Sequence, residues 1–187
     1  MGHAIKTCFT EIDKLRIDKV TQFFSVLVRS GYQELTDRDI KVICEQFKKG
    51  LVPNHPNLMT NIAIFTKTAV KQIIFNGNDK CKDYLATFTR QTIVPQVNES
   101  FDSLSISEAS MILRSINVIL RFPDPQLTNK ILNCQVDVLN RASNMELYSL
   151  LDIALEVNLS VPGDAKLDQF KISIIQALGK CYFKFYV

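Results

Sequence analysis

Apolar residues recur every three to four positions along most of the chain, and this spacing constrains the fold more than any other feature. It places the apolar side chains on one face of an α-helix, whereas a half-buried strand would alternate apolar and polar residues. The chain also has only six glycines and six prolines, fewer turn signals than a sandwich or barrel of short strands needs. The sequence therefore predicts an all-α protein.

Breaks between the periodic segments divide the chain into about eight helices, which form consecutive antiparallel pairs. The first helices of the pairs are expected to begin roughly forty residues apart, as in helical-repeat proteins. A single sixth helix is expected from Pro125 through Leu139. The pairs are expected to cover residues 18–50, 57–97, 105–142 and 144–184.

Capping and breaking residues predict where these helices begin and end. Ser105 and Glu108 match a capping box, and Asp18, Thr36 or Asp37, Asn57 and Asn144 are expected to begin other helices. We expect Gly31 to supply a left-handed stop and Gly50 to close the second helix. Pro95 is expected to end or kink the fourth helix.

Weak internal similarity supports a repeat. Residues 112–116 align with residues 149–153 and with residues 23–27, and the first two of these segments precede a Pro-containing break and another amphipathic helix. This arrangement favours one domain over residues 1–187 in which the helix pairs stack as a short α-solenoid. An irregular globular helix bundle is the alternative.

The cysteines and the apolar segments bear on compartment and membrane insertion. The five cysteines are widely spaced and form no CxxC pair, which predicts neither a zinc site nor a disulfide framework but a reducing compartment. Residues 1–6 lack the pattern of a signal peptide, and no transit peptide is visible. The longest apolar stretch, residues 23–28, is too short to span a bilayer, so no membrane span is expected.

The sequence offers little that resembles an active site. His3 and His55 are the only imidazoles, and neither lies in a recognisable nucleophile motif. No nucleotide-binding, zinc-protease or EF-hand motif occurs, and the carboxylates are scattered among basic residues. We therefore expect no catalytic residues, no metal, no cofactor and no small-molecule substrate. An enzyme with an unfamiliar helical active site is the least favoured hypothesis.

Basic residues on the predicted helices suggest a surface for phosphate. The net charge is +3, and it is uneven: 14 basic and 10 acidic residues lie up to Ser100, against 8 and 9 after it. Stacked helix pairs would align basic side chains into a strip that follows a phosphate backbone. A small excess of positive charge is, however, also typical of an ordinary solvated surface. The candidate RNA-binding residues are Lys67, Lys71, Lys80, Lys82, Arg114 and Arg121.

The end of the chain, residues 181–187, is strongly apolar. It either completes the last helix and packs on its neighbour, or docks on another subunit, or continues into further chain. The candidate partner-docking residues are Tyr182, Phe183, Phe185 and Tyr186.

Residues 105–142 and 144–181 each contain a capped helix, a break and a second amphipathic helix. This pattern resembles the degenerate repeats of octotricopeptide, heptatricopeptide and FAST-kinase-like proteins, although the RAP domain that often follows such repeats is not visible. The resemblance implies an α-solenoid in a mitochondrion or chloroplast that binds organellar RNA. Some proteins of this kind are ribosomal subunits that hold ribosomal RNA or neighbouring proteins.

Two functions follow as expectations. The first is a non-enzymatic RNA-binding protein, a structural subunit of a mitochondrial ribosome or another ribonucleoprotein, with ribosomal RNA and neighbouring proteins as partners. It predicts an aligned basic strip and binding that weakens steeply with salt. The alternative is a protein–protein scaffold of the HEAT or armadillo type, which predicts an apolar or mixed face and a covered C-terminal tail.

Overall fold

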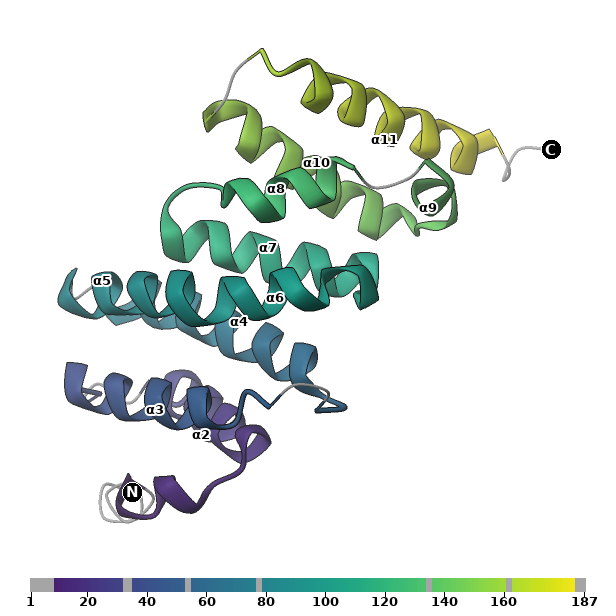
Figure 1. The fold of residues 1–187 in the computed structure, drawn as a ribbon. Coiled ribbons are helices and arrows are strands. Elements are labelled where there is room, and N and C mark those ends of the chain that lie inside the picture. Colours follow the sequence, from purple (N-terminus) through teal and green to yellow (C-terminus); the bar gives the residue numbers. More distant parts are fainter. Residues whose placement is uncertain are drawn as a thin grey trace. The chain divides into compact units, whose positions relative to one another are not determined.

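The structure is a computed structural model, and it describes residues 9–31, 35–52, 55–76, 79–133, 136–160 and 163–183. Every secondary-structure element in these ranges is helical, and neighbouring helices pack in antiparallel pairs (Figure 1). The predicted all-α class is confirmed. The chain divides into two compact units, residues 1–96 and 97–187, which are described separately.

The first unit has two layers of helices. Helix α2 packs beside α3 and α4, while α5 packs on both α3 and α4. One layer is therefore formed by α2 and α4, and the other by α3 and α5. The elements are η1 (Ile12–Lys14), α2 (Ile17–Arg29), α3 (Asp37–Lys49), α4 (Leu58–Asn76), α5 (Asp79–Phe88), the π-helical turn η2 (Thr89–Ile93) and α6 (Val94–Ser100), which contains the boundary between the units.

An aromatic cluster joins the two layers of the first unit. Phe65 of α4 lies at its centre, with ring centroids 4.1 Å from Phe47 of α3 and 5.3 Å from Phe24 of α2. The ring of Phe88, at the end of α5, lies 5.8 Å from that of Phe65. All four side chains are at most 5% exposed, so one ring from each helix contributes to this core.

The fourth expected helix does not end at Pro95. Helical structure continues from α5 through η2 into α6, and the N–H of Val94 donates to the carbonyl of Thr89 in the π-helical pattern. Proline has no N–H to donate, and its ring clashes with the carbonyl four residues earlier. A wider turn immediately before Pro95 accommodates that ring.

The second unit contains the remaining helices. α7 packs beside α10, and α10 packs beside α11, which also contacts α8 and α9. Its core includes Ile112, Leu127, Leu147 and Ile174, which are fully buried. The elements are η3 (Phe101–Ser103), α7 (Ile106–Leu120), α8 (Pro125–Leu132), α9 (Val136–Arg141), α10 (Asn144–Ser160) and α11 (Ala165–Phe183).

The prediction of a single sixth helix from the apolar spacing is wrong. It is divided into α8 and α9, and Asn133 closes the first of them with φ −90° and ψ 7°, outside helical values. Asparagine competes for backbone hydrogen bonds and favours helix ends over helix interiors. The periodicity continues across the break because α11 contacts both short helices.

The structure corrects two predicted caps and confirms others. Thr36 and Ser105 each form a capping box, as the sequence predicts for Ser105. The cap of α10 is Ser143 rather than Asn144, since the Ser143 N–H donates to Glu146 at 2.8 Å and the Glu146 N–H donates to the Ser143 hydroxyl. Asp18 is not a cap either, because α2 already begins at Ile17.

The Ser143→Ala variant is expected to lose about 1 kcal/mol of unfolding free energy, because the cap satisfies N–H groups at the start of α10. Hydrogen bonds from Ser143 lower the pKa of Glu146. A carboxylate with a lowered folded-state pKa contributes stability above its unfolded value, and that contribution is lost as the pH falls through the folded one. Urea unfolding at pH 7 and pH 3 measures both effects, with Ser149→Ala as the control. An equal loss at both pH values would contradict the reciprocal bond with Glu146.

The two glycines that end helices in the first unit act differently. Gly31 follows α2 with φ +64°, so the predicted left-handed stop is confirmed. Gly50 closes α3 with φ −87°, a value that other residues adopt freely. A Cβ at Gly50 would lie 2.6 Å from the Cβ of Ile17. Gly50 therefore serves the close approach of the chain to the start of α2.

Candidate nucleic-acid interface

The solvent-facing side of α4 carries two of the predicted RNA-binding residues. Ile64, Lys67, Lys71 and Ile74 are exposed, and their spacing of three, four and three residues places them on one helix face. Phe65 lies on the buried face and holds α4 in the core. The helical period alone thus brings Lys67 and Lys71 together, one turn apart, as predicted.

α2, which packs beside α4, presents a matching stripe. Lys19, Gln22, Val26 and Arg29 are exposed at the same three, four and three spacing. Sequence reasoning did not single out Lys19 and Arg29, although their ten-residue separation on a predicted helix places them on one side. We call the set Lys19, Arg29, Lys67 and Lys71 the α2/α4 basic face.

This layer is almost free of negative charge. α4 contains no Asp or Glu, and α2 contains only Asp18, whose carboxylate lies 3.5 Å from the Arg16 guanidinium. The other layer differs, because α3 and α5 together carry six basic and five acidic residues. A positive potential with little internal neutralisation is what a phosphate backbone requires.

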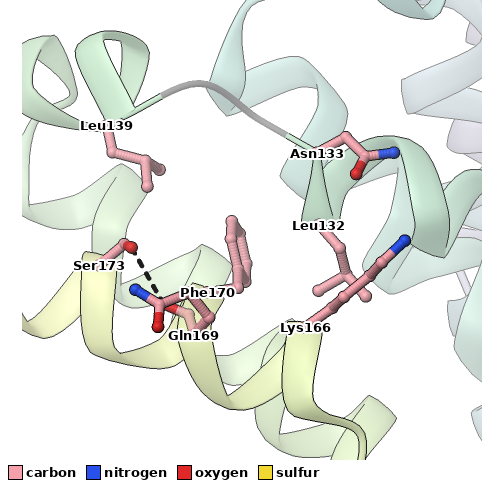
Figure 2. A pocket seen from close by; sticks show the side chains of 7 residues that line it. All are labelled: Leu132, Asn133, Leu139, Lys166, Gln169, Phe170 and Ser173. Carbon is pink, nitrogen blue, oxygen red and sulfur yellow. Dashed lines mark hydrogen bonds between the residues drawn. The ribbon is translucent and has the colours of Figure 1, made fainter.

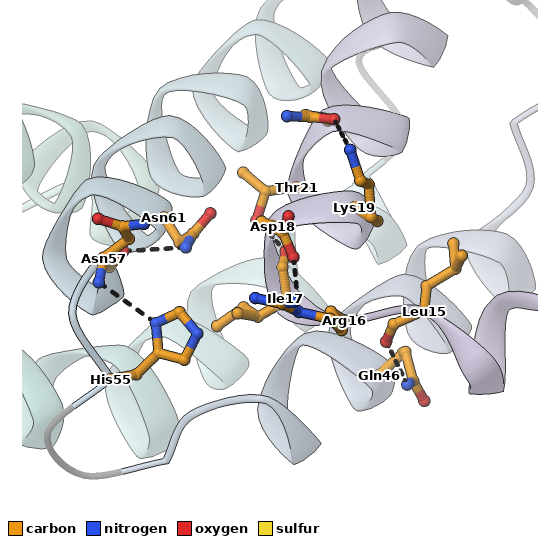
Figure 3. Close-up of polar contacts among 11 residues, drawn as sticks. Leu15, Arg16, Ile17, Asp18, Lys19, Thr21, Gln46, His55, Asn57 and Asn61 are labelled. Carbon is orange, nitrogen blue, oxygen red and sulfur yellow. Dashed lines mark hydrogen bonds and ion pairs between the residues drawn. The ribbon is translucent and has the colours of Figure 1, made fainter.

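The four cations differ in their local partners. Lys19 donates to the Gln22 amide at 3.2 Å, and the Arg29 Nε donates to the Ser25 hydroxyl at 3.0 Å (Figure 3 shows Lys19 at the start of α2). Within the described part of the chain, Lys67 and Lys71 form no ion pair or hydrogen bond. Among those residues, an incoming anion therefore displaces no protein group from Lys67 or Lys71.

The structure places the other predicted basic residues elsewhere. Lys80 is exposed and Lys82 half-buried at the start of α5, in the layer with interleaved acids. Arg114 of α7 lies 3.5 Å from the Asp152 carboxylate of α10, and Arg121 follows α7 in the left-handed conformation with φ 64°. Arg114 therefore already has an anionic partner. A role for these residues in one strip with Lys67 stays a prediction.

The predicted docking tail lies at the limit of the described chain. The backbone of Tyr182 and Phe183 completes the last turn of α11, while Phe185 and Tyr186 lie outside the described residues. The first of the expected alternatives, completion of the last helix, holds for the backbone as far as Phe183. Docking of this tail on another subunit stays a prediction.

The remaining candidate groups have structural surroundings. The Nδ1 of His55 accepts the N–H of Asn57 at 3.3 Å in the turn before α4 (Figure 3), and His3 lies outside the described residues. Cys44 and Cys81 are buried, and burial raises the pKa of the Cys44 thiol well above its usual value and that of Cys81 to about 11. Both are therefore neutral thiols near pH 7, poorly suited to act as nucleophiles.

The second unit has a cavity of about 260 Å³ between α11 and the break that separates α8 from α9. Phe170 points into it between Leu132 and Leu139, and Lys166 and Gln169 lie at its edge (Figure 2). Its lining contains no acid–base pair. In the described residues, no three His, Cys, Asp or Glu side chains gather as a metal site, and no helix there is long and apolar enough to cross a membrane.

Comparisons with family models, with curated proteins and with solved structures found no match to this chain. What the chain binds must therefore be inferred from its own surfaces. Two of them stand out: the α2/α4 basic face in the first unit, and the exposed apolar side chains of α7 and α10 in the second.

Proposed function

We propose that this protein is a non-enzymatic helical-repeat protein that binds RNA, and that the α2/α4 basic face holds the phosphate backbone. One observation carries the proposal: two adjacent helices present four cations, and the single acidic residue on them already lies beside Arg16. Neutralising phosphates with Lys and Arg releases condensed counterions, which supplies most of the affinity in sequence-independent binding. Lys67 and Lys71 supply two of its four cations.

The composition of the face also indicates how selective the binding is. Among the exposed residues of α2 and α4 that the structure describes, none is aromatic. Proteins that stack bases use aromatic side chains, so this face is expected to follow the backbone with little sequence preference. The resemblance to octotricopeptide-like repeats supports RNA as the polyanion, within a mitochondrial ribosome or another organellar ribonucleoprotein.

Titration of a fluorescent single-stranded RNA with the purified chain, repeated across a salt series, tests this proposal. Four phosphate contacts predict a slope of about −3 in log affinity against log salt concentration. The double variant Lys67→Glu/Lys71→Glu is expected to bind at least about tenfold more weakly and to lose about half of that slope, because two contacts become repulsive.

A matched control changes the same amount of charge in the other layer. Arg38 and Lys41 are exposed three residues apart on α3, and Arg38→Glu/Lys41→Glu is expected to change the affinity far less. Equal losses in both double variants would mean that only net charge matters. Absence of binding at low salt would overturn the proposal, and binding to anionic vesicles but not to RNA would assign the face to a membrane surface.

A protein–protein scaffold is the second candidate, and a separate observation favours it. In the second unit Met111 and Val118 of α7 and Met145, Tyr148 and Leu155 of α10 are exposed. Apolar side chains gathered on adjacent helices are typical of a protein-binding surface. A chain that fails to bind RNA but forms a stable protein complex through this face would establish the scaffold function instead.

A further inference from the structure

The outer face of α7 and α10 has a regular composition. The two helices lie side by side and run in the same direction, since each is followed by a segment that returns antiparallel to it (Figure 1). Their exposed positions fall on one side of each helix, with Met145 76% exposed and Leu155 49% exposed. We call this surface the α7/α10 face; its residues are Met111, Arg114, Val118, Met145, Tyr148, Asp152 and Leu155.

One ion pair lies in the middle of the α7/α10 face. The Nη1 of Arg114 is 3.5 Å from the Oδ2 of Asp152, and these side chains are 57% and 52% exposed. Met111 lies about one turn before Arg114 and Val118 one turn after it. On α10, Tyr148 and Leu155 flank Asp152 in the same way.

An exposed ion pair of this kind contributes little to folding stability. Both charges are accessible from solvent, and each retains unused hydrogen-bonding capacity toward a second partner. The face is therefore apolar at its ends and carries one cation and one anion at its centre, on different helices. Such a surface is complementary in charge to itself.

We propose that the α7/α10 face binds a second copy of this chain in a two-fold symmetric dimer. The two-fold axis would run parallel to α7 and α10, in the interface and between them. Each α7 then faces α10 of the other copy, so that Arg114 meets Asp152 of the second copy and Asp152 meets its Arg114. At the same heights Met111 meets Tyr148 of the second copy, and Val118 meets its Leu155.

Charge decides among the symmetric arrangements. A two-fold axis perpendicular to the helices would place each α7 against α7 of the other copy, with Arg114 against Arg114 and Asp152 against Asp152. Like charges in contact across an interface are unfavourable, whereas the parallel axis forms a four-member network of alternating charge. An isologous contact also closes on itself, because the α7/α10 face of each copy is covered by that of the other.

The dimer does not depend on RNA binding. Its residues belong to the second unit, whereas the α2/α4 basic face belongs to the first. Lys67→Glu/Lys71→Glu is therefore expected to leave the association state unchanged, and the charge variants of the α7/α10 face test the dimer alone.

Two single charge reversals and their mixture provide the test. Arg114→Asp places acid against acid twice across the interface, and Asp152→Arg places base against base twice, so each variant is expected to be monomeric by sedimentation velocity. In an equimolar mixture, the introduced Asp of one variant faces the introduced Arg of the other, and the native Asp152 of the first faces the native Arg114 of the second. We expect the mixture to form a heterodimer while the wild-type chain forms a homodimer.

Lys166→Asp on α11 is the control, because it makes the same charge change as Arg114→Asp outside the face, and it is expected to remain dimeric. Urea unfolding of each variant verifies that the fold is retained. A wild-type chain that sediments as a monomer, single variants that still dimerise, or a mixture that stays monomeric would each overturn the proposal.

Discussion

Replacing Phe65 with alanine is expected to lower the free energy of unfolding of the first unit by about 3–5 kcal/mol. The Phe65 ring contacts Phe24, Phe47 and Phe88, which come from the three other main helices of this unit. Truncation removes the buried ring and leaves a cavity that four packed helices cannot collapse to fill. The loss combines the transfer free energy of the ring with that of the aromatic contacts.

Urea unfolding followed by circular dichroism measures this effect, and amide hydrogen exchange assigns it to α2–α5 rather than to the second unit. The adjacent residue supplies the control, since Ile64 lies on the exposed side of α4. Ile64→Ala is expected to cost less than about 1 kcal/mol. Comparable losses in the two variants would contradict the position of Phe65 at the centre of the core.

Gly50→Ala is expected to destabilise the first unit by about 1–3 kcal/mol, although alanine is the better helix former. The added Cβ would lie 2.6 Å from the Cβ of Ile17 and 3.3 Å from its Cα. Those atoms are attached to the backbone and cannot turn away by a change of rotamer. Relief requires that the end of α3 and the start of α2 move apart, and buried contacts are lost.

The matched control is Gly179→Ala in α11, where an added Cβ meets nothing within 4 Å. This variant is expected to gain about 0.5–1 kcal/mol, because glycine in a helix interior costs conformational entropy. Thermal unfolding of both variants should therefore show Tm shifts of opposite sign. A rise in Tm for Gly50→Ala would contradict the close approach to Ile17.

Only half of the candidate RNA surface could be predicted from the sequence. Lys67 and Lys71 could be assigned to one face because helix geometry relates neighbouring turns without knowledge of the fold. Lys19 and Arg29 join them only because α2 packs beside α4. In the sequence Arg114 is as basic as these residues. In the fold it already has an anionic partner, because the Asp152 carboxylate of α10 lies beside it.

The sequence by itself determined the features that local interactions control. Apolar periodicity predicted the all-α class, the Ser105–Glu108 pattern predicted a helix start, and Gly31 predicted a left-handed stop. Each depends on residues within about one turn of one another, so the interactions that stabilise it can be recognised in a short stretch of sequence.

Only the tertiary structure decided the rest. The contact of Gly50 with Ile17 and the Arg114–Asp152 ion pair both depend on which helices become neighbours. That choice depends on burial summed over many side chains, and no short window of sequence contains it.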